Sequence, residues 1–90
     1  MFNLRDALKF LKMIRLDIKN LPFNINELVD GLNVELEHGS INSMTNITND
    51  DLLLTGKIAL AHLFEDPKYY TKLKIIEGGR NYLEYLHKLY

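Results

Sequence analysis

Apolar residues recur at helical spacing along most of the chain, and no stretch alternates between apolar and polar residues strongly enough to indicate a sheet. The most apolar segment is residues 49–65. We expect a helix there, with Asn49 as its N-cap and with Asp50 and Asp51 in its first turn. Apolar side chains cover so much of its circumference that other helices must surround it. Its narrow polar strip comprises Asp51, Thr55, His62 and Asp66, with Glu65 at the edge.

Two amphipathic helices are expected before this central helix. The first covers residues 3–19, and the second begins near Asn24 or Asn26 and stops at Gly39. Glycines inside predicted helices, Gly31 in the second and Gly56 in the central one, weaken them by about 1 kcal/mol relative to alanine. We expect a neighbouring backbone to pack closely at both.

Two short helices are expected after the central helix. Pro67 opens one that reaches Ile76, with Asp66 as its cap, and Gly78-Gly79 ends it. Residues 80–90 form the last. The sequence therefore predicts an all-α protein, a compact bundle of four to five helices around the central helix 49–65, in which residues 1–90 are a single domain.

Composition and charge exclude several classes of protein. The 90 residues contain no cysteine, which rules out disulfides and thiolate zinc sites. No apolar run approaches the roughly 20 residues that span a bilayer, and the first ten residues lack a signal-peptide pattern, so we expect a cytoplasmic protein. The net charge of −1 conceals a segregation, because residues 21–51 carry six carboxylates and no lysine or arginine. An acidic middle between basic ends argues against nucleic-acid binding and favours a protein partner or self-association.

Two pairs of residues at helical spacing form the candidate chemical site. Glu35 and His38 are three residues apart, and His62 and Glu65 repeat that spacing in reverse order. If the second and central helices are antiparallel, the four side chains can meet as a nitrogen and oxygen ligand set of the kind that holds zinc, iron or manganese in helix bundles.

A metal-free interpretation of these four residues is simpler. A di-iron bundle needs two Glu-x-x-His motifs and two further glutamates on separate helices, and the two candidate pairs supply only one forward Glu-x-x-His motif. We therefore favour a hydrogen-bonded seam, in which His62 pairs with Glu35 or another carboxylate and fixes helix register, with no cofactor. Phosphate-binding glycine loops, His-Glu-x-x-His and Gly-x-Ser-x-Gly motifs are all absent from the sequence, and we expect no enzymatic activity.

Partner contacts are expected on the two terminal helices. The first helix has a basic face that is open to two interpretations, a solvated surface or a contact surface. The last helix carries tyrosines, whose amphipathic rings suit interfaces. The candidate partner-binding residues are Arg5, Lys9, Lys12, Lys19, Tyr82, Tyr85 and Tyr90.

Three sequence blocks resemble a known family. They are Val34–Gly39 with Glu-Leu-Glu-His-Gly, Thr48–Asp51 with Thr-Asn-Asp, and Ile58–Tyr70 with Ala-His-Leu-x-Glu-x-Pro-x-Tyr-Tyr. In this order they are similar to a family of small uncharacterised helical proteins, a domain of unknown function, of bacteria, phages and large DNA viruses. The resemblance covers about residues 23–73, and its signature includes the four candidate site residues.

The resemblance implies a compact helical domain and a viral or phage origin, without an assigned activity. We therefore expect a small non-enzymatic structural or interaction protein, a virion or phage accessory component located in the host cytoplasm or the virion. A metal-binding helical domain is the alternative, and nucleic-acid binding is the least favoured of the three.

Overall fold

The computed structural model describes residues 1–41, 44, 46 and 49–76. Within these residues the chain forms four α-helices, one short 3₁₀ helix and no strand, which confirms the predicted all-α class. None of these helices has the length and apolar content needed to cross a bilayer. The elements, in chain order, are α1 (Leu4–Met13), η1 (Ile18–Asn20), α2 (Ile25–Ile41), α3 (Leu52–Glu65) and α4 (Tyr69–Ile76).

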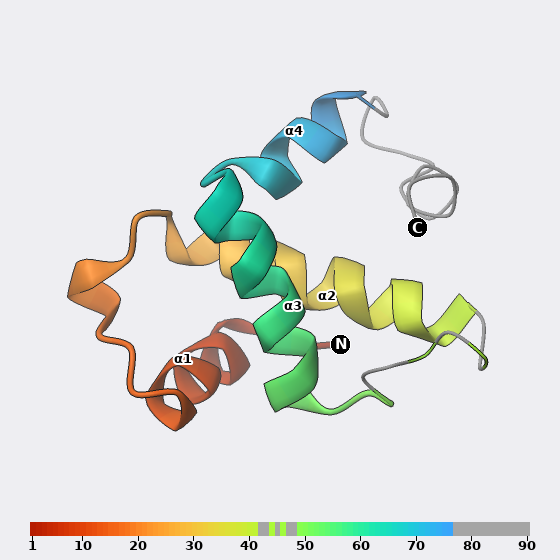
Figure 1. Ribbon diagram of the computed structural model, residues 1–90, viewed down its shortest axis with the longest axis horizontal. Coiled ribbons are helices and arrows are strands. Elements are labelled where there is room, and N and C mark those ends of the chain that lie inside the picture. Colours follow the sequence, from red (N-terminus) through yellow and green to blue (C-terminus); the bar gives the residue numbers. More distant parts are fainter. Residues whose placement is uncertain (42–43, 45, 47–48, 77–90) are drawn as a thin grey trace.

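Helices α2 and α3 share the centre of the fold. Figure 1 shows α3 crossing α2, with α1 and α4 toward opposite ends of α3, and both central helices contact both α1 and α4. The prediction of one surrounded central helix is therefore wrong in part. On α3, Leu54 is 42% exposed and Phe64 is 56% exposed, so one side of this helix faces solvent.

The core lies where the four helices meet. Burial of apolar side chains there is the main favourable contribution to folding, at about 25 cal/mol per Å² of apolar surface removed from water. The buried hydrophobic residues are Ala7, Phe10, Leu11, Phe23, Leu28, Leu32, Val34, Ala59, Leu63, Tyr70 and Leu73.

Helix α1 is shorter than the sequence predicts. A capping box between Asn3 and Asp6 starts it, but it ends at Met13 rather than Lys19. Arg15 adopts a left-handed conformation with φ 60°, and the N–H of Leu16 bonds to the carbonyl of Leu11 at 2.9 Å. These are the bonds of a Schellman motif, which normally has glycine at the left-handed position. Because arginine occupies this position here, the sequence contains no stop signal for α1.

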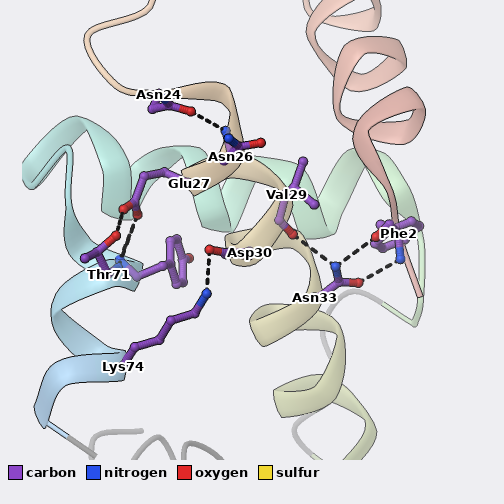
Figure 2. Close-up of polar contacts among 10 residues, drawn as sticks. Phe2, Asn24, Asn26, Glu27, Val29, Asp30, Asn33, Thr71 and Lys74 are labelled. Carbon is purple, nitrogen blue, oxygen red and sulfur yellow. Dashed lines mark hydrogen bonds and ion pairs between the residues drawn. The ribbon is translucent and has the colours of Figure 1, made fainter. Parts of the chain in front are cut away.

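Helix α2 is longer than the sequence predicts. It begins after Asn24, whose side chain accepts the N–H of Asn26 at 2.8 Å (Figure 2). It passes through Gly39 without a break and ends at Ile41, so Gly39 is not a stop. Gly39 is instead buried inside the helix.

The N-cap of helix α3 lies two residues later than predicted. Its N-cap is Asp51, whose side chain accepts the N–H of Leu54 at 3.1 Å, whereas Asn49 and Asp50 have φ of 46° and 63° and lie outside the helix. Asn and Asp tolerate this left-handed region better than most residues do. The three polar residues therefore form the turn before the helix and its cap.

The last predicted helices are described only in part. Helix α4 begins at Tyr69, two residues after Pro67, and reaches Ile76 as expected. The predicted Gly78-Gly79 stop and the predicted helix 80–90 lie outside the described residues.

The start of the chain is fastened to the middle of α2. Figure 2 shows the Asn33 amide bonded to both backbone groups of Phe2. Asn33 Oδ1 accepts the Phe2 N–H at 2.7 Å, and Asn33 Nδ2 donates to the Phe2 carbonyl at 2.8 Å. The same amide nitrogen donates to the carbonyl of Val29 at 3.1 Å, so one side chain positions the segment that leads into α1.

Gly31 and Gly56 contact aromatic rings rather than neighbouring backbones, which corrects the prediction of close backbone contact at these two positions. The Phe10 ring of α1 lies directly against Gly56 of α3, and a Cβ at this position would overlap three ring carbons. Phe10 is fully buried, so its ring can yield to a Cβ at Gly56 only by displacing other core side chains.

We expect Gly56→Ala to lower the free energy of unfolding by about 1–3 kcal/mol, the usual cost of overpacking a core. Chemical denaturation of both proteins measures the difference. In a Phe10→Leu background the same change should cost less, because the ring that blocks the Cβ is gone. A more stable Gly56→Ala protein, as helix propensity alone would give, would contradict the contact.

Candidate functional site

Two of the four predicted site residues meet where α2 and α3 cross. Glu35 of α2 is only 2% exposed, and its Oε2 lies 3.7 Å from Nε2 of His62 on α3. This separation is too long for a direct hydrogen bond. It is an ion-pair distance whenever His62 is protonated. Glu35, a predicted partner of His62, therefore lies beside it in the structure.

A tyrosine from α4 completes the contact around Glu35. The hydroxyl of Tyr70 donates to Glu35 Oε2 at 2.8 Å, in a fully buried position. The His62 ring stacks on Tyr69 with centroids 4.4 Å apart, and the Tyr70 ring meets both of these rings edge-on. Edge-on and offset-stacked pairs are the favoured aromatic geometries.

A second buried carboxylate, Glu27, holds the beginning of α4. Its Oε2 accepts the backbone N–H groups of Tyr70 at 3.2 Å and Thr71 at 3.3 Å. Its Oε1 accepts the Thr71 hydroxyl, and Figure 2 shows Glu27 reaching from α2 to Thr71. These N–H groups belong to the first turn of α4, where a negative charge is stabilised by the helix dipole. Glu27 therefore caps a helix that lies 43 residues later in the chain.

Gly31 lies midway between the two glutamates. Glu27, Gly31 and Glu35 are spaced four residues apart, so they follow one stripe of α2. The Tyr70 ring lies against Gly31, and a Cβ there would overlap its carbons. Tyr70 is thus held at its backbone by Glu27, at its ring by Gly31 and at its hydroxyl by Glu35. We call this arrangement the tyrosine clamp.

Two ion pairs add to the attachment of α4. Lys74 Nζ lies 2.7 Å from Asp30 Oδ2 on α2, and Figure 2 shows the lysine extended toward it. Lys72 Nζ lies 2.7 Å from Asp66 Oδ2 at the end of α3. The hydrogen bond from Lys72, with a second from the Lys68 N–H, holds the pKa of Asp66 below its ordinary value. The predicted cap of α4, Asp66, thus bonds to the turn before the helix, while Glu27 bonds to its first turn.

The other two predicted ligands are not part of this contact. His38 is half-buried on α2, and Glu65 is exposed on α3. Across residues 1–41, 44, 46 and 49–76, no group of three or more histidine, aspartate and glutamate side chains is close enough to hold a metal ion. The four predicted residues therefore do not assemble as one ligand set.

The predicted partner-binding residues occupy different elements. Arg5, Lys9 and Lys12 are exposed on α1, whereas Lys19 is exposed on η1 because the first helix ends early. Tyr82, Tyr85 and Tyr90 lie outside the described residues.

The predicted site omitted Glu27, Gly31 and Tyr70. Their signal in the sequence is the repeated spacing of four along α2, which places two carboxylates and a glycine on one stripe. The sequence contains no indication that the stripe is buried, because carboxylates normally face water.

One family matches most of the chain. The match is to Protein of unknown function (DUF5661), over residues 7–79. The chain belongs to this family. The DUF5661 match extends beyond the predicted family-like core of residues 23–73, since it takes in most of α1, and it includes the whole tyrosine clamp. No curated protein and no solved structure matches the chain.

In this DUF5661 protein the clamp joins α4 to α2. Tyr70 is 0% exposed and its hydroxyl is bonded to Glu35, while both oxygens of Glu27 accept hydrogen bonds. A buried carboxylate without donors is costly, whereas one with several donors is stabilised. The arrangement is suited to fixing the position of α4 on α2.

We expect Tyr70→Phe to lower the free energy of unfolding by about 1–3 kcal/mol, because Glu35 loses its buried donor. Glu35→Leu should also destabilise, by leaving the Tyr70 hydroxyl without this acceptor. The double variant should lose less than the sum of the two, as measured by urea denaturation in a double-mutant cycle. Strictly additive losses would show that the two groups do not interact.

The metal alternative has a direct test. Because Glu35 and His62 are the two of the four candidates that meet, we expect purified protein to contain no stoichiometric zinc, iron or manganese and its Tm to be unchanged by a chelator. Elemental analysis and thermal melts measure both. Bound metal that disappears in His62→Ala, together with a chelator-sensitive Tm, would restore the ligand interpretation.

Proposed function

We propose that this DUF5661 protein is a small non-enzymatic interaction domain that binds an acidic protein partner through the outward face of α1. The proposal depends on one observation about that face. It combines basic side chains that form no ion pair with the described residues and apolar side chains that are exposed to solvent. On the resemblance of its sequence blocks, the proposal extends to a role as a virion or phage accessory component.

The outward face of α1 is a basic ridge with apolar borders. Arg5, Lys9 and Lys12 form the ridge, and none of them makes an ion pair with another described residue. The one acidic residue of α1, Asp6, is engaged by the backbone N–H of Asn3. The exposed apolar side chains beside the ridge are Leu4, Leu8 and Met13.

This mixture favours a protein partner over a nucleic acid. Lysine and arginine attract any polyanion, but exposed leucine and methionine gain from contact with apolar side chains rather than with phosphates. An amphipathic segment with glutamates beside leucines would match both the ridge and its borders. The exposed acidic residues elsewhere, among them Glu37, Asp50 and Asp51, disfavour a long nucleic-acid track.

The burial of the tyrosine clamp supports a non-enzymatic role. Its polar groups bond to one another between α2 and α4, and Glu35 and Tyr70 are almost entirely removed from solvent. Groups that are used to hold helices together are not available to a substrate.

A synthetic amphipathic peptide with glutamate on one face and leucine on the other tests the proposal. We expect it to bind the wild-type protein, and to bind Arg5→Gln/Lys12→Gln about tenfold more weakly, since each surface charge contact contributes about 0.2–1 kcal/mol. Fluorescence anisotropy at two salt concentrations measures both. Affinity should fall, without vanishing, as salt is raised.

The matched control is Lys68→Gln, which removes an exposed lysine outside α1 and should bind the peptide as the wild type does. Equal weakening by this control and by Arg5→Gln/Lys12→Gln would contradict a site on α1. Tighter binding of short duplex DNA than of the peptide, with a steep dependence on salt, would replace the protein partner with nucleic acid.

A further inference from the structure

The outer face of α3 is unusually apolar for a surface that contacts solvent. It comprises the side of the helix opposite the buried residues Thr55, Gly56, Ala59 and Leu63. An exposed helix face normally carries mostly charged and polar residues. Here the face contains two charged residues among apolar ones. Its members are Leu54, Lys57, Ile58, Ala61, Phe64 and Glu65.

The two charges are arranged symmetrically about a small residue. Lys57 lies four residues before Ala61, and Glu65 lies four residues after it. Eight residues correspond to about 12 Å along a helix, so Lys57 and Glu65 are too far apart to pair with each other. Both are exposed, and neither makes an ion pair with any described residue.

We infer that this face binds a second copy of the chain, with the two α3 helices antiparallel and the two-fold axis at Ala61. In that arrangement Lys57 of each copy lies opposite Glu65 of the other, which gives two equivalent ion pairs. The small Ala61 side chains meet at the axis and allow a short interaxial distance, about 8 Å. The contact is isologous and closes as a dimer.

Phe64 provides the apolar anchor. Although it is 56% exposed, its ring packs at 56° against buried Phe23, with centroids 6.3 Å apart. A ring held from beneath loses little conformational freedom when a partner covers it. The two-fold axis places Phe64 at the same height as Ile58 of the second copy, and the exposed Leu54 extends the apolar surface toward the start of the helix.

The charges distinguish a second copy from other apolar occupants. A lipid surface would have to desolvate Glu65, whereas an antiparallel copy supplies Lys57 to it. One face of a 14-residue helix is smaller than the roughly 800 Å² per partner of standard interfaces. We therefore expect a weak dimer with a Kd in the micromolar range or above.

Charge exchange tests the inference. Sedimentation velocity on the full chain, from about 1 µM to about 1 mM, should show a monomer–dimer equilibrium. Lys57→Glu and Glu65→Lys should each weaken dimerisation about tenfold or more, since each replaces two attractions with two repulsions. The double variant Lys57→Glu/Glu65→Lys should return the Kd to within about threefold of wild type, because the pairs are restored with exchanged signs.

Three other variants locate the face. Ala61→Arg should abolish the dimer by separating the helices, with an unchanged far-ultraviolet circular dichroism spectrum. Lys68→Glu, an exposed change beyond the end of α3, should leave the Kd unchanged, and so should Arg5→Gln/Lys12→Gln, which tests the α1 surface separately. A wild-type chain that stays monomeric throughout, or a double variant that dimerises no better than the single ones, would overturn the inference.

Discussion

The position of α4 depends on one residue of this fold, Tyr70. Its ring can lie against α2 because position 31 has no side chain, and its two polar ends meet carboxylates one helical turn to either side. The two buried carboxylates are tolerable because each has donors from α4. Each residue of the clamp therefore depends on the others being in place. A change at Gly31, Glu27 or Glu35 affects the contact between α2 and α4.

The existence of the described helices follows from local pattern, but their ends do not. Apolar spacing located α1 to α4 because burial of one face is the dominant requirement on a helix. The stop of α1 was missed because Arg15 adopts the left-handed conformation that sequence rules assign to glycine. The opposite error occurred at Gly39, where burial inside α2 outweighs a glycine's preference for helix ends.

Prediction of the candidate site required the relative orientation of the second and central helices, which the sequence does not specify. The spacing of Glu35 with His38 and of His62 with Glu65 suggested four side chains on two antiparallel helices. In Figure 1, α3 instead crosses α2, so the helices approach at one place and then diverge. One residue of each pair, Glu35 and His62, meets there. Local sequence does not predict where two helices cross. The hydrogen bond from Tyr70 to Glu35 depends on that position as well.

The capping of α4 by Glu27 has a consequence for the order in which the protein assembles. Helix α4 has eight residues, fewer than the roughly 12–15 that make an isolated helix even marginally stable in water. Two of its first N–H groups are satisfied by a side chain 43 and 44 residues earlier. We therefore expect α4 to form only after α2 has formed. Helix α2 is synthesised first and provides the surface on which α4 folds. We expect the same dependence in the native state, because α4 needs Glu27 of α2 as the acceptor for its first N–H groups, whereas Asn24 and Asp51 cap α2 and α3 without any contribution from α4.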